Sequence, residues 1–252
     1  MRVIPLRAYV DNYIFVLEEE STSTVAVVDP GDARPVLDHL AKTGRGLGAI
    51  LNTHHHRDHV GGNSALTGRF PNIGVFGSAR DRGRIPEQTD FLHDGEVINV
   101  CGWEARVVEV PGHTHGHLAY FFAAQDGSGD LFSGDTVFGG TIGNLFEGTP
   151  DTMFESMRKI RALPAATRIW CGHEYTLQYV REAVLIDPGN ARLADRLRAL
   201  EASAQTGKPT VPLLLQEECA TSPFFRWDAP DLTRHLGTEP GLATFRRLCG
   251  MN

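Results

Sequence analysis

Apolar positions recur with two different periods along this chain. In roughly the first two thirds, short runs rich in Val, Ile and Leu are bounded by Gly, Pro and Asp, which is typical of buried strands. We predict strands at 3–6, 13–17, 24–28, 48–52, 107–110, 130–134 and 168–172. Helical periodicity between these runs predicts helices at 34–42, 58–69 and 152–163. The apolar face of the last of these helices is formed by Met153, Phe154, Met157 and Ile160.

The pattern becomes helical after residue 174. Segments 175–186 and 191–205 have helical periodicity and are joined by a Pro-Gly turn, and 242–248 has that of a short amphipathic helix. Strands and helices followed by helices alone indicate an α/β fold with a small C-terminal helical domain. We therefore divide the chain into 1–174 and 175–252.

The composition is that of an ordinary globular protein and serves mainly to exclude classes. With 252 residues the chain can bury a sizeable core, and its 41% hydrophobic and 22% charged residues are near the average. A net charge of −7 without a basic block argues against a nucleic-acid partner, and we expect no signal peptide or membrane span because the apolar runs are short. The four cysteines form no C-x-x-C pair, so we expect reduced thiols in a cytoplasmic protein.

The densest chemical signal is the pattern H-x-H-x-D-H at 54–59. Side chains alternate along an extended chain, so His54 and His56 should point the same way. Asp58 and His59 fall where the chain should turn into a helix, and they can face a second point. Crowded imidazole and carboxylate groups gain nothing from packing, which favours two metal ions that share one loop.

Later strands supply further ligands. Three of them end near a glycine that is followed by a potential ligand, and these ligands are His113, Asp135 and His173. The ends of adjacent strands converge on one edge of a sheet, where sites in α/β folds usually lie. Imidazole nitrogen and carboxylate oxygen suit zinc, iron and manganese, whereas calcium and magnesium prefer oxygen alone.

We expect these groups to hold two divalent ions. The expected ligands of one ion are His54, His56 and His113. Those of the other are Asp58, His59 and His173. Asp135 would bridge the ions, and the remaining room for water suits a hydrolase in which Asp58 and Asp135 are the catalytic carboxylates. The neighbouring His55, His115 and His117 are not expected to be ligands: by alternation His55 points away from His54 and His56, and the other two are expected to orient the ligands or pack against them.

The ligand motif resembles that of the metallo-β-lactamase superfamily, and later segments resemble glyoxalase II, the hydroxyacylglutathione hydrolases. The segments that carry the resemblance are 11–14, 28–31, 111–117, 146–150, 172–176, 188–190 and 209–212. It implies a four-layer αββα sandwich followed by a small helical domain that binds substrate. Zinc is the first expectation for the two metals, and iron or manganese would also fit.

The activity that this resemblance implies is thioester hydrolysis. An S-2-hydroxyacylglutathione, such as S-D-lactoylglutathione, would be cleaved to glutathione and a 2-hydroxy acid, the second step of methylglyoxal detoxification. We expect a monomer or weak oligomer that acts on this small molecule.

The resemblance is weakest where the thiol carrier should bind. Asn144, Cys249 and Asn252 stand where the family has basic residues that hold a carboxylate of glutathione. Each lost charge-assisted hydrogen bond would cost about 1.5–3 kcal/mol. With Tyr175 and Phe146, these positions are the expected substrate-binding residues.

Two alternatives therefore stay open. One is a hydrolase of the same fold that acts on another thiol-carrier thioester, a lactone or a β-lactam. The other is a non-catalytic metal-binding or regulatory protein. A set of seven ligands argues against the latter, because a structural metal site is normally closed and tetrahedral.

Overall fold

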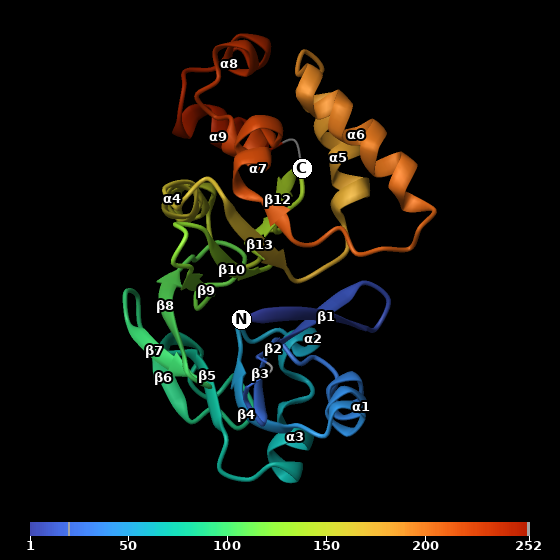
Figure 1. Cartoon of the computed structure of the whole chain (residues 1–252). Helices are drawn as coiled ribbons and strands as arrows, with labels where there is room; N and C mark the ends of the chain where they lie inside the picture. The colour runs from blue at the N-terminus through green and yellow to red at the C-terminus, as the bar shows by residue number, and fades with distance from the viewer. Residues whose placement is uncertain (20, 251–252) are drawn as a thin grey trace.

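Two mixed sheets of six strands form the centre of the molecule (Figure 1). A computed structural model of the chain describes residues 1–19 and 21–250. The first sheet comprises β1 (Arg2–Ala8), β2 (Asn12–Glu18), β3 (Thr24–Val28), β4 (Gly46–Leu51), β5 (Gly74–Ser78) and β6 (Asp90–Leu92), in that order. The second has the order β14 (Leu213–Leu214), β13 (Thr167–Cys171), β10 (Gly129–Gly134), β9 (Leu118–Ala123), β8 (Trp103–Glu109) and β7 (Val97–Val100). A two-stranded ribbon pairs β11 (Val137–Phe138) with β12 (Thr141–Ile142).

The helices cover the outer faces of both sheets. They are α1 (Ala33–Thr43), α2 (Arg57–Val60), α3 (Asn63–Arg69), α4 (Pro150–Arg161), α5 (Thr176–Ile186), α6 (Ala191–Ala204), α7 (Leu215–Thr221), α8 (Pro230–Leu236) and α9 (Leu242–Cys249), with 3₁₀ turns at Ala79–Asp81 and Pro223–Phe225. In β3, Val25 and Val27 pack in one cluster with α1 and α3, whereas Ala26 and Val28 belong to the core between the sheets. This alternation follows from the pleat and explains why the strand is apolar on both faces.

Helix α4 lies against the second sheet and completes the layers. Its N-cap is Thr149, whose hydroxyl accepts from the Thr152 N–H, and Pro150 occupies the first turn. Met153 and Met157 are fully buried in the central core. The order helix, sheet, sheet, helix confirms the predicted four-layer αββα sandwich.

The C-terminal helices extend this core rather than standing apart from it. Strand β14 pairs antiparallel with β13, and therefore the C-terminal part contributes a strand to the second sheet. Glu218 of α7 is fully buried, binds Arg196 of α6 and accepts the Gly140 N–H at 3.0 Å. The division at residue 174 stays a prediction.

The predicted helix at 58–69 is wrong, because α2 and α3 are separate. Gly61 and Gly62 lie between them, and the Gly62 N–H donates to the Pro30 carbonyl at 2.8 Å. A Cβ on Gly62 would stand 2.4 Å from that oxygen. The chain can approach Pro30 so closely only at a glycine, and the helix is interrupted there.

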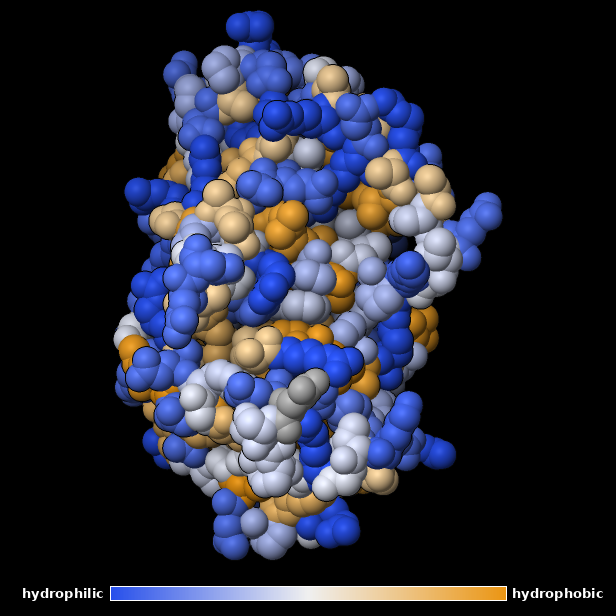
Figure 2. All heavy atoms as spheres, viewed as in Figure 1, coloured by the Kyte–Doolittle hydropathy of each residue, from blue (hydrophilic) through white to orange (hydrophobic). Residues whose placement is uncertain are grey.

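Hydrophilic side chains dominate the face of the molecule drawn in Figure 2. Apart from the adjacent Tyr9 and Val10, the large apolar side chains that are exposed occur at separate places in the chain, for example Val97, Phe146 and Leu185. Among the described residues, no helix combines the length and apolarity that crossing a membrane requires.

Candidate metal centre

The seven predicted ligands meet at one end of the two sheets. They come from the segments that follow the carboxyl ends of β4, β8, β10 and β13, and Asp58 and His59 lie in α2. Gly134 ends β10 with a φ of +48°, and a Cβ there would stand 2.3 Å from the Thr53 hydroxyl. This close approach brings Asp135 beside the loop that carries His54.

Six of the predicted ligands fall into two groups whose ligand atoms are close enough to hold a metal ion. In each group the potential ligand atoms all lie within 4.8 Å of one another. The first group is His54, His56 and His113. The second group is Asp58, His59 and His173.

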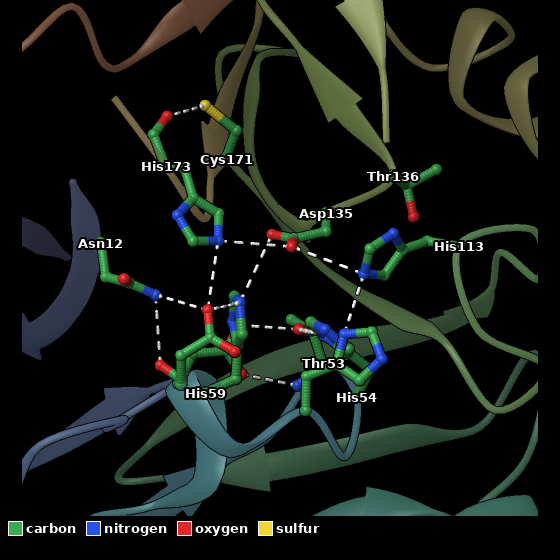
Figure 3. A network of polar contacts seen from close by, with 12 residues as sticks. Asn12, Thr53, His54, His59, His113, Asp135, Thr136, Cys171 and His173 are labelled. Carbon is green, nitrogen blue, oxygen red and sulfur yellow. Dashed lines mark hydrogen bonds and ion pairs between the residues drawn. The ribbon is translucent and has the colours of Figure 1, made fainter. Parts of the chain in front are cut away.

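The carboxylate of Asp135 lies between the two groups (Figure 3). Its Oδ2 atom is 3.5 Å from His113 Nε2 in the first group and 3.3 Å from His173 Nε2 in the second. Its Oδ1 atom is 3.5 Å from His59 Nε2. This is the position that a bridging ligand needs.

Hydrogen bonds orient four of the five imidazoles. In each, Nδ1 contacts an oxygen that can accept its proton, so Nε2 presents its lone pair to the centre. The pairs are His54 with Thr53 Oγ1 at 3.0 Å, His59 with Asp29 Oδ2 at 3.1 Å, His113 with the Asn144 carbonyl at 2.8 Å and His173 with Asp11 Oδ1 at 2.9 Å. His56 is turned the other way, with Nδ1 3.0 Å from His113 Nε2.

Asp29 also lies within 4.8 Å of ligand atoms of His54 and His59, but its oxygens are already in use. Oδ1 accepts the Thr53 N–H at 2.7 Å. Oδ2 accepts the Thr53 hydroxyl at 2.7 Å and the His59 Nδ1–H at 3.1 Å. Asp29 is therefore better suited to orient His59 than to bind a metal.

Several buried atoms at the centre have no hydrogen-bond partner among the described residues, although two of them face each other as an ion pair at 3.5 Å. They are His54 Nε2, His59 Nε2 and Asp135 Oδ1, which make no hydrogen bond. Buried polar atoms are nearly always paired, so their convergence calls for a further group. Nitrogen and carboxylate donors that leave water positions open fit a pair of divalent cations.

The three histidines of the first group are held in the neutral form that binds a cation. Burial lowers the pKa of His56 to about 4 and that of His113 below its usual value. Burial likewise lowers the pKa of His54 well below its usual value. All three imidazoles are therefore neutral at pH 7, and only neutral imidazole binds a metal.

In the second group, carboxylates oppose the effect of burial. Burial alone would lower the pKa of His173, but contacts with Asp135 and Asp58 raise it to about 10. Burial alone would raise the pKa of Asp135, but His59 and His173 hold it well below its usual value. The carboxylates are thus ionised at neutral pH, and the imidazoles paired with them would release their protons when a cation binds in their place.

The other histidines of the two motifs lie outside both groups. His117 is fully buried and stacks on His54 with ring centroids 4.6 Å apart. Its Nε2 accepts the backbone N–H of Asp135 at 3.2 Å. It therefore helps to hold two of the predicted ligands in place.

His55 and His115 belong to a separate ionic cluster. His55 Nδ1 lies 3.2 Å from Asp81 Oδ1, and Arg84 donates to Glu147. Glu147 also accepts the backbone N–H of His115 at 2.7 Å. This cluster joins the loop of the first motif to the loop that carries His113.

Sequence reasoning missed the groups that orient the histidines. Asp11 and Asp29 hold His173 and His59, and the Asn12 side chain donates to Asp58 Oδ2 at 2.9 Å. A ligating histidine almost always donates the proton on its other nitrogen to an acceptor. An isolated carboxylate near a strand end in the sequence is therefore a candidate for that acceptor.

Four of the five predicted substrate-binding residues are described by the structure, and these four lie near the centre or line the cavity beside it. The Tyr175 ring lies parallel to that of His173, with centroids 4.8 Å apart. Phe146 is 66% exposed, with its ring 5.2 Å from that of His113. Asn144 and Cys249 line a cavity of about 270 Å³ together with Phe146. Asn252 lies outside the described residues.

Solved structures with a similar fold support the architecture. One is the crystal structure of TTHA1623 in a di-iron-bound form, with a TM-score of 0.61 and 25% identity over 88% of this chain and 100% of that one. Another is the BLEG-1 B3 metallo-β-lactamase, with a TM-score of 0.60 and 26% identity over 68% of this chain and 90% of that one.

Sequence comparisons define the family. The model of the metallo-β-lactamase superfamily matches residues 10–173, and that of the hydroxyacylglutathione hydrolase C-terminus matches residues 174–252. A hydroxyacylglutathione hydrolase of Synechococcus sp. (strain JA-2-3B'a(2-13)) is 52% identical over 100% of this chain and 98% of its own length. One of Gloeobacter violaceus is also 52% identical, over 95% and 94%. These matches confirm the resemblance, and the chain belongs to the hydroxyacylglutathione hydrolases of the metallo-β-lactamase superfamily.

Proposed function

We propose that the protein hydrolyses thioesters of glutathione with 2-hydroxy acids, S-D-lactoylglutathione among them, at a centre of two divalent cations. The observation that carries this proposal is the Asp135 carboxylate, which lies within 3.5 Å of imidazole nitrogens from both ligand groups. Relatives that bear the name hydroxyacylglutathione hydrolase match the whole chain and support the substrate class.

The ligand assignment is part of the proposal. One cation is held by His54, His56 and His113. The other is held by Asp58, His59 and His173. Asp135 bridges them. When bound, two such cations generate a nucleophile from water at neutral pH and polarise the thioester carbonyl.

The two carboxylates have different roles because they differ in exposure. The Asp58 side chain is 42% exposed, whereas that of Asp135 is 9% exposed, so water and substrate reach Asp58 more readily. Asn12 fixes Asp58 Oδ2 with a hydrogen bond of 2.9 Å, and Asp58 can orient the attacking water. Asp135 holds the two ligand groups at a fixed separation.

The remaining steps need little acid catalysis. Thiols have an ordinary pKa near 8.5, so the glutathione thiolate leaves without a strong general acid. Burial raises the pKa of Tyr175 to about 12, so its hydroxyl keeps its proton and can donate to the carrier beside His173.

We propose zinc as the metal, and iron or manganese would fit the same donors. Elemental analysis of the purified protein tests this choice. We also propose a cytoplasmic monomer or weak oligomer, which fractionation of the source cells and light scattering would test.

The decisive experiment is steady-state hydrolysis of S-D-lactoylglutathione by protein of known metal content. Asp135→Asn should remove turnover and lower the metal content. Asp126→Asn, which removes a carboxylate from the exposed turn at the opposite end of β10, should change neither. A fully loaded protein that hydrolyses a β-lactam or a lactone but no glutathione thioester would replace this proposal with the alternative activity.

A further inference from the structure

A small cavity opens directly beside the first ligand group. It has a volume of about 270 Å³, and its lining is Ile142, Gly143, Asn144, Leu145, Phe146 and Cys249. The Asn144 carbonyl holds His113 Nδ1 at 2.8 Å, and the Phe146 ring lies 5.7 Å from that of His56. A group bound at the metal centre on this side therefore extends into this cavity.

The lining carries no charge among the described residues. It consists of apolar side chains, one amide, one glycine and one thiol. Burial raises the pKa of Cys249 to about 12, so the thiol is neutral as well. The cavity can offer shape, apolar contact and neutral hydrogen bonds, but no ion pair.

The arginines close to the lining residues, in sequence or through a contact, do not supply a cation that could form an ion pair within the cavity. Arg84 is bound to Glu147, and Arg246 makes two hydrogen bonds to Asp151. Arg247 stands two residues before Cys249 on α9, and residues so spaced do not share a helix face. A carboxylate in the cavity would lose hydration without gaining a cationic partner.

We infer that the thiol-carrier half of the substrate enters this cavity and is recognised there by shape and uncharged contacts. A carboxylate on that half then makes no favourable contribution to affinity. The substrate class accordingly includes thioesters whose carrier is neutral, such as glutathione esterified at its carboxylates. This inference rests on the proposed function and concerns the specificity of the same site.

Binding of thioethers tests the inference without turnover. The metal-loaded protein would be titrated calorimetrically with S-hexylglutathione, its glycine monoethyl ester and its diethyl ester. We expect the esters to bind as tightly as the free acid within about twofold, or more tightly, because esterification removes no ion pair and avoids the loss of carboxylate hydration. An ester that binds about tenfold or more weakly would overturn the inference, since a loss of that size is typical of a charge-assisted hydrogen bond.

A gain of charge provides the second test. Asn144→Arg leaves the backbone carbonyl that holds His113 and places a cation at the cavity, where residue 144 is exposed. We expect this variant to bind S-hexylglutathione at least about fivefold more tightly and the diethyl ester unchanged. Gln125→Arg, in the exposed turn before β10, adds the same charge at the far end of that strand and should alter neither constant.

The outcomes separate the inference from the proposed function. If S-D-lactoylglutathione is hydrolysed but S-hexylglutathione binds equally well to wild type and Asn144→Arg, the carrier does not enter this cavity and the inference fails. If the thioethers bind as expected but no glutathione thioester is hydrolysed, the cavity's specificity stands and the proposed function fails.

Discussion

Replacement of Asp29 by asparagine tests how the centre is oriented. Asp29 is 2% exposed and has a φ of +51°, in the left-handed region that Asp and Asn tolerate better than most residues. The change therefore keeps the volume and the backbone while it removes the charge. Its carboxylate accepts three hydrogen bonds, two from Thr53 and one from His59. An amide offers one oxygen and must turn its NH₂ group toward one of these donors.

The expected effect falls on metal affinity. Loss of a group that orients a metal-binding imidazole typically costs 10- to 100-fold in affinity, or about 1.4–2.7 kcal/mol. We expect a loss in this range, because His59 is fully buried and Asp29 is the partner of its Nδ1. The measurement is zinc competition with a chromophoric chelator at fixed pH.

Asp32→Asn provides the matched control. Asp32 stands three residues further along the same turn and caps α1 by accepting the Arg34 N–H at 2.9 Å. Asparagine caps helices as well as aspartate does, so this variant should bind metal like the wild type. If Asp29→Asn binds zinc as tightly as the wild type, Asp29 does not orient His59 for metal binding. If both variants lose the same affinity, the loss comes from a disturbance of the whole turn.

Three further predictions concern ion pairs and the metal. Glu218→Gln should lower the free energy of unfolding by about 3 kcal/mol in chemical denaturation, because it leaves the buried Arg196 with only one carboxylate partner among the described residues, the half-exposed Glu217 at 3.7 Å. Glu201→Gln in an exposed ion pair should cost less than about 0.5 kcal/mol. The hydrogen bond from Arg84 holds the pKa of Glu147 at about 2, below its usual 4.5, so its stabilisation is present above pH 4.5 and is lost as the pH falls through 2. The stability difference between metal-free wild type and Glu147→Gln should shrink over that window, and a constant difference would contradict the ionic role. Chelation should stop turnover in the wild type, and Zn²⁺ should restore it there but not in Asp135→Asn.

Several strands, and the convergence of the candidate ligands, were predictable because their signals are local, whereas strands such as β5 and β9 were not predicted. The predicted strand at 24–28 coincides with β3, and the predicted helix at 34–42 lies within α1. The break between α2 and α3 was not predictable, since Gly62 is required by the carbonyl of Pro30, which lies far away in the sequence. The helical spacing of apolar residues carries no information about a contact with a distant part of the chain.

The orienting carboxylates were missed for the same physical reason. Asp11 reaches His173 because the Tyr13 N–H bonds to the Gly172 carbonyl and the Glu174 N–H bonds to the Asp11 carbonyl. That pairing joins segments about 160 residues apart, and a single sequence gives no register for it. The chemistry of a ligating histidine predicts that an acceptor exists, but only the fold identifies it.

The pairing of β14 with β13 has a consequence for synthesis on the ribosome. All seven proposed ligands have been translated once His173 emerges, yet β13 then has an open edge, because β14 comes later in the chain. An unpaired edge strand is a template for association with other chains. The nascent protein therefore passes through a stage in which its ligand set is complete but its second sheet can still recruit a neighbour, and residues 213–214 end that stage.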